Sequence, residues 1–127
     1  MRKAFVGLLM LAGACTAAYP ARVVVPNGFY TGNSYQALSP LERERYVAGV
    51  LDGLLSSPLM ANANIPLAGN LQKCSLQLGL NTAQATAIVE KYMIDHPEQW
   101  GSGAAWIVLA AMKDACNKTG NPIAEMR

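Results

Sequence analysis

The spacing of apolar residues predicts one long helix over residues 39–56. Ser39, Pro40 and Glu42 occupy the positions of a capping box with a proline in the first helical turn. Gly49 and Gly53 fall inside this segment, and each weakens a helix by roughly 1 kcal/mol relative to alanine. We expect them to permit close approach of another backbone; the alternative is that they are merely tolerated. The apolar residues recur every three or four positions, as on one buried stripe: Tyr46, Val47, Val50, Leu51, Leu54 and Leu55.

A second long helix is predicted between Asn81 and His96. Asn81 and Gln84 form another capping pair, and Pro97 ends the helix because the residue before a proline avoids the helical conformation. His96, the single histidine, lies where the helix dipole favours a cation, so packing or capping is its expected role and catalysis is the alternative. One face of this helix collects Ala85, Ile88, Val89, Tyr92, Met93 and His96.

The most apolar predicted helix covers residues 103–117, with Ser102 as its expected cap. It is apolar over most of its circumference, which is typical of a central helix. A short helix is also predicted over residues 31–38. These elements together predict an all-α fold: a compact bundle of about four helices, formed by a single domain over residues 19–127.

Residues 58–70 are predicted to form a long internal loop, because they contain two prolines, three asparagines and a glycine. Long loops in compact domains are often functional. The alternative is that the apolar residues of this loop simply cover the core: Leu59, Met60, Ile65 and Leu67. Upstream of the bundle, the three valines within residues 22–28 predict a short extended segment that Pro26 ends.

The N-terminus has the pattern of an export signal over residues 1–18. Arg2 and Lys3 precede a short apolar run over residues 4–12, and small residues follow. The sequence is compatible with two cleavage modes. A cut before Tyr19 would release the protein into the periplasm, whereas an imperfect lipobox makes Cys15 a candidate for lipidation and would anchor the protein to a membrane.

The net charge and the lack of catalytic motifs limit the functions that this protein can have. The chain has 10 basic and 8 acidic side chains, and the signal would remove Arg2 and Lys3, which leaves a nearly neutral domain. A neutral domain without a basic cluster is a poor candidate for binding nucleic acid. No known catalytic motif occurs, and one histidine with scattered cysteines makes no predicted metal site, so we expect neither an enzyme nor a cofactor.

Export also bears on the two remaining cysteines. Cys74 and Cys116 are the only thiols left after signal removal, and a pair of cysteines in an exported domain favours a disulfide. Two separate buried thiols are the alternative.

The order and spacing of several segments are similar to those of one known family. The first half contains Gly28-Phe29-Tyr30-Thr31-Gly32-Asn33, followed by Tyr46-Val47-Ala48-Gly49-Val50-Leu51-Asp52-Gly53-Leu54. The second half contains Cys74, then Leu80-Asn81-Thr82-Ala83-Gln84, Val89-Glu90-Lys91-Tyr92-Met93, His96-Pro97-Glu98 and the run from Ala104 to Cys116. This arrangement covers most of residues 28–116 and resembles the Rap/Tai family of periplasmic immunity proteins against type VI secretion amidases.

The resemblance implies a helical fold, a periplasmic location, a tendency to form homodimers and inhibition of a peptidoglycan amidase effector. It also supports pairing of Cys74 with Cys116. The chain departs from the family at Cys74-Ser75-Leu76, where relatives have Cys-x-Pro, and it lacks the further cysteines that many relatives carry in the first half. A different envelope binding module, such as a small chaperone or an accessory subunit, is the alternative function.

The resemblance transfers no contact residues, so candidates for partner binding come from loop chemistry. Apolar or aromatic side chains on surface loops make good anchors at protein interfaces. On this basis the predicted partner-binding residues are Leu59, Met60, Ile65 and Trp100.

Overall fold

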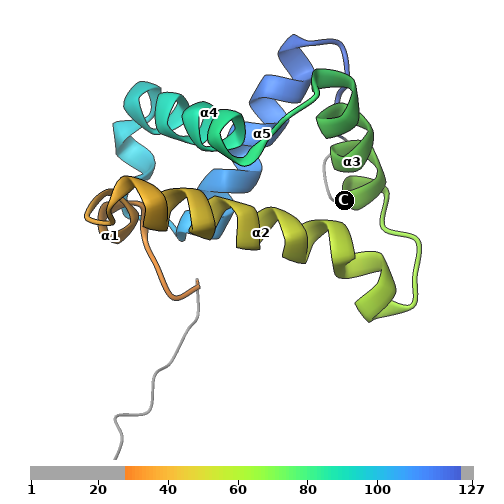
Figure 1. Cartoon of the computed structure of the whole chain (residues 1–127), viewed down its shortest axis with the longest axis horizontal. Coiled ribbons are helices and arrows are strands. Elements are labelled where there is room, and N and C mark those ends of the chain that lie inside the picture. Colours follow the sequence, from red (N-terminus) through yellow and green to blue (C-terminus); the bar gives the residue numbers. More distant parts are fainter. Residues whose placement is uncertain (1–27, 124–127) are drawn as a thin grey trace, which may run out of the picture.

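The computed structural model describes residues 28–123, and these form a helical bundle (Figure 1). The helices are α1 (Gly32–Gln36), α2 (Pro40–Ala61), α3 (Pro66–Leu78), α4 (Thr82–Asp95), the 3₁₀ turn η1 (Pro97–Gln99) and α5 (Ala104–Lys118). The described part contains no β-strand, only an isolated bridge between Thr31 and Gly103. The predicted all-α fold is confirmed. The predicted signal, the candidate lipidation of Cys15 and the extended segment before Gly28 lie outside the described residues.

Three predicted helix starts are confirmed by their hydrogen bonds. Capping boxes occur at α1, α2 and α4, with Thr31, Ser39 and Asn81 as the respective N-caps. The prediction that Ser102 caps α5 is wrong. Gly103 is the N-cap, and no side chain bonds to the first turn. Instead, the amide of Ala104 donates to the carbonyl of Tyr30 over 2.8 Å, so the chain before α1 satisfies the start of α5.

The predicted end of the first long helix at Ser56 is wrong, because α2 continues through Pro58 to Ala61. A proline inside a helix cannot donate to the carbonyl four residues earlier, here that of Leu54. The hydroxyl of Ser57 donates to that carbonyl over 2.6 Å, which replaces the missing hydrogen bond. The helix ends at Ala61, and its C-cap residue, Asn62, adopts the left-handed conformation.

The long loop predicted over residues 58–70 is also wrong. Only residues 62–65 connect α2 to α3, and α3 begins at Pro66. The start of α3 has no side-chain cap, since its N-cap is Ile65, so the usual polar start signal is missing from the sequence. Burial of one face of α3 stabilises this helix instead, through Leu67, Ala68, Leu71 and Cys74.

The core has two parts, which α5 joins. The first part lies among α1, α2, α4 and the first half of α5, and includes Tyr35, Val47 and Val89. The second part lies between α3 and the second half of α5, and includes Leu71 and Met112. Helix α5 contacts all four other α-helices, which confirms its predicted central position.

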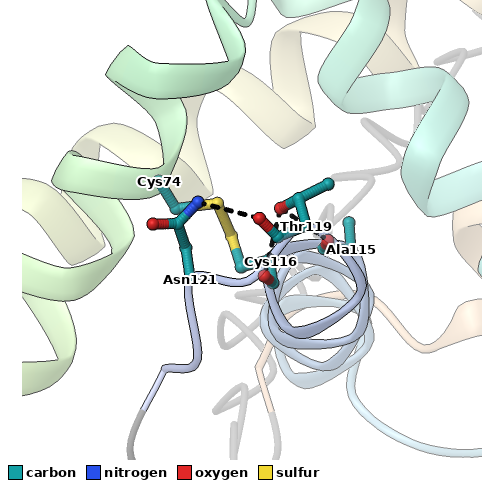
Figure 2. Close-up of a disulfide and its surroundings, with 5 residues drawn as sticks. All are labelled: Cys74, Ala115, Cys116, Thr119 and Asn121. Carbon is teal, nitrogen blue, oxygen red and sulfur yellow. Dashed lines mark hydrogen bonds between the residues drawn. A yellow bond between two sulfur atoms is a disulfide. The ribbon is translucent and has the colours of Figure 1, made fainter.

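The Cys74–Cys116 disulfide is present and connects α3 to the end of α5 (Figure 2). The two Cα atoms are 5.9 Å apart and both side chains are fully buried. The chain after α5 turns back over the bond: the amide of Asn121 donates to the carbonyl of Cys116 over 2.9 Å, and Thr119 bonds to the last turn. The disulfide therefore crosslinks elements that are distant in sequence within the second part of the core.

Candidate docking surface

Two of the four predicted partner-binding residues lie side by side in sequence on the last turn of α2. The side chain of Leu59 is 86% exposed and that of Met60 is 74% exposed. Figure 1 shows this turn at the edge of the molecule, at the end of α2 opposite to α1. Large apolar side chains exposed together at a protruding helix end are unusual for a surface that contacts only water. We call Leu59 and Met60 the α2 tip.

The other two predicted residues have different surroundings. Ile65 is half-buried and lines an apolar groove next to the α2 tip. Trp100 is half-buried and packs against the first part of the core, and its indole N–H donates to the carbonyl of Met93 over 2.8 Å. The carbonyl of Trp100 also accepts from the amide of Asn33, so this residue lies beside α1, away from the α2 tip. The structure thus brings three of the four residues to one end of the molecule and separates Trp100 from them.

The apolar groove lies between α2, α5 and the start of α3 and has a volume of about 480 Å³. Among the residues that line it, none is ionisable. Trp106 of α5, which is 56% exposed, lies on its rim. The lining residues are Gly49, Val50, Gly53, Leu54, Ser57, Ile65, Leu67, Ala105, Trp106 and Leu109.

The glycines of α2 do not contact another backbone within residues 28–123, which differs from the prediction. A Cβ atom added at Gly49 or at Gly53 would meet no heavy atom within 4 Å. Both glycines are exposed and form part of the wall of the groove. The groove was missed at the sequence level, although the recurrence of Gly49, Gly53 and Ser57 at intervals of four marks a helix face without large side chains.

A second, smaller hollow of about 160 Å³ lies where α1, α2 and α4 meet, beside Tyr35, Arg43 and Glu90. The guanidinium of Arg43 pairs with the carboxylate of Glu90 over 2.9 Å and connects α2 to α4. The hydroxyl of Tyr35 is buried and has no hydrogen-bond partner among the described residues. Burial, followed by the nearby charge of Glu90, raises the pKa of Tyr35 to about 12.

Replacement of Tyr35 by Phe is therefore expected to leave stability at pH 7 unchanged or slightly higher, because the ring still packs and only an unpaired hydroxyl is lost. At alkaline pH the wild type should lose more stability than the Tyr35→Phe variant. The pKa of Tyr35 is higher in the folded state than its ordinary value of 10.0, so the neutral hydroxyl favours the folded state. This contribution to the free energy of unfolding is fully present below pH 10.0 and is lost as the pH rises towards about 12. Urea unfolding at pH 7, 10 and 11.5 would measure this. Equal losses in both proteins above pH 10 would contradict it.

His96 caps the end of α4, as expected, and its ring lies 4.3 Å from that of Tyr92. Its Nδ1 atom is 3.1 Å from the carboxylate of Glu98. Within residues 28–123, no group of three or more His, Cys, Asp or Glu side chains could hold a metal ion. None of the helices over the same residues has the length and apolarity to cross a membrane.

No protein-family profile, no curated protein and no solved structure matches this chain.

Proposed function

We propose that this protein is a periplasmic immunity protein that binds and inhibits a peptidoglycan amidase effector of a type VI secretion system. The resemblance of residues 28–116 to the Rap/Tai family motivates the activity. The disulfide is compatible with an oxidising compartment such as the periplasm. The observation that carries a binding role is the α2 tip, where two large apolar side chains are exposed together.

The α2 tip has the shape and chemistry of an anchor for a cleft. It ends a helix of 22 residues, and the C-cap residue that follows, Asn62, adopts the left-handed conformation. Leucine and methionine side chains can fill a concave apolar site and exclude water from it. An amidase needs water and substrate in its cleft, so an apolar plug would block hydrolysis without any chemistry by the immunity protein.

The proposal is tested with purified peptidoglycan amidase effectors from type VI secretion systems of the source organism. Leu59→Asp and Met60→Asp are each expected to weaken binding about tenfold or more, because a carboxylate would be desolvated in the interface. Calorimetric titration measures the affinity, and release of peptidoglycan fragments measures the inhibition.

Leu76→Asp and Ile94→Asp are matched controls, because these side chains are 74% and 75% exposed but lie on α3 and α4. Both controls are expected to bind like the wild type. If the unmodified protein neither binds nor inhibits any of these amidases, the immunity role is refuted. Equal weakening by the control variants would place the contact elsewhere on the molecule.

A second function, a binding module such as a small envelope chaperone or an accessory subunit, is favoured by one observation. The apolar groove with Trp106 on its rim could hold apolar segments of several clients. Affinity capture from the cell envelope separates the two functions, since an immunity protein should recover one dominant partner and a chaperone should recover many.

A further inference from the structure

The groove between α2 and α5 is a large apolar surface that the described residues leave uncovered. Its volume is about 480 Å³, and its walls include two exposed glycines of α2 and the half-exposed ring of Trp106. A solvent-facing groove of this composition is costly, because apolar surface stays in contact with water. What covers the groove can be inferred from the segment that begins beside it.

The described chain begins next to one end of this groove. Tyr30 packs edge-on against Tyr46 of α2, with ring centroids 5.4 Å apart, one helical turn before Gly49. Its carbonyl accepts from the amide of Ala104, the residue directly before the groove residues Ala105 and Trp106. Tyr30 is therefore held between the same two helices that form the groove walls.

The residues just before Tyr30 give the chain both exposed apolar surface and a change of direction. Phe29 is 81% exposed, and Gly28 has a φ of 96°, a conformation that favours glycine. Upstream of Gly28 the sequence reads Arg22-Val23-Val24-Val25-Pro26-Asn27. The three valines are the most apolar run of the segment, and β-branched residues favour an extended backbone.

The length of this segment fits the groove. Eight residues of α2 separate Gly49 from Ser57, a rise of about 12 Å. Four to six residues separate the valines from Phe29, and a chain of that length can reach about 13 to 20 Å when it is extended. The run of valines can therefore lie along the groove while Tyr30 stays where it is.

We propose that Val23, Val24 and Val25 of the same chain occupy the groove between α2 and α5. Gly49 and Gly53 lack side chains, so the backbone of an extended segment can approach α2 closely there. The valines then bury against Leu54, Ala105 and Trp106. This segment is chosen over a second copy or another protein because its attachment point lies beside the groove, which makes its effective concentration high. The proposal does not rest on the α2 tip, so either can fail alone.

Disulfide trapping in the mature protein, purified from the cell envelope, tests this directly. The Val24→Cys/Gly53→Cys variant is expected to form an additional disulfide within one chain, identified by peptide mapping under non-reducing conditions. The control is Val24→Cys/Ala48→Cys, because Ala48 lies on another face of α2, beside Asp52 and Leu55. This pair is expected to stay unlinked.

Three outcomes would overturn the proposal: no bond in the first variant, equal bonding in both variants, or a bond that links two chains and so assigns the groove to a second copy.

If the cysteine variants fail to fold, a second measurement decides. Replacing all three valines by serine is expected to increase acrylamide quenching of Trp106 and to shift its emission to longer wavelength. Trp100 contributes equally to both proteins, since it packs in the core away from the groove. An unchanged emission and quenching would also overturn the proposal.

Discussion

Replacing both Cys74 and Cys116 by alanine is expected to lower the free energy of unfolding by about 4 kcal/mol. The two residues are 42 positions apart, so the bond closes a loop that covers almost half of the described chain. In the chain-entropy account, the crosslink destabilises the unfolded state by restricting it, and this effect grows with loop length. For a domain of this size, the melting temperature should fall by roughly 15 to 30 °C.

The loss should also be uneven within the fold. Helix α3 belongs to the second part of the core only, whereas α4 packs against α2 and α5 in the first. Hydrogen exchange should therefore accelerate more in α3 than in α4. The control is wild-type protein that has been reduced in denaturant and refolded, which should match the alanine variant. A change below about 1 kcal/mol, or equal exchange in both helices, would contradict the assigned role of the bond.

Gly32→Ala is expected to destabilise the protein by about 3 kcal/mol, the second largest effect. A Cβ atom at this position would lie 2.7 Å from Cδ1 of Ile107 and 2.9 Å from both the Cα and the carbonyl oxygen of Trp100. The backbone of Trp100 cannot rotate away as a side chain can. Shifting it would break the hydrogen bonds that Gly32 and Asn33 donate to the carbonyls of Ser102 and Trp100, over 2.9 and 2.8 Å.

Gly69→Ala is the matched control. Gly69 lies in α3, and a Cβ atom there would meet nothing within 4 Å. This variant should stabilise the protein by up to about 1 kcal/mol, because alanine is the better helix former. Urea unfolding of both variants measures the difference. A Gly32→Ala protein as stable as the wild type would show that α1 does not pack tightly against the segment before α5.

The sequence predicts the helices that begin with polar caps. Ser39 and Asn81 each form the capping box that their spacing predicts, and the short helix predicted from Thr31 also begins there. The central position of α5 also follows from its apolar circumference. The disulfide follows from the expectation of export, because only two thiols remain. Each of these features depends on information that a single sequence contains: the spacing of capping residues within one turn, the local hydrophobicity, or the number of cysteines.

The candidate site is less predictable. Pro58 indicates the end of a helix, yet α2 continues because the hydroxyl of Ser57 bonds to the carbonyl of Leu54. Leu59 and Met60 therefore end a helix and do not belong to a loop. Trp100 is a residue type that often anchors a protein interface, but here its indole N–H donates to the carbonyl of Met93 inside the bundle. Sequence alone cannot show whether such a side chain faces solvent or a neighbouring helix.

Local order along the chain thus specified four of the five α-helices and the cysteine pair. Packing between distant segments decided the rest: that α3 is a helix without a polar cap, that the glycines of α2 open a groove, and that Tyr30 meets the start of α5. The physical reason is that burial is shared between elements. A helix without a polar cap becomes stable when a neighbouring helix covers its apolar face. A groove forms only where the side chains of two neighbouring helices do not pack against each other.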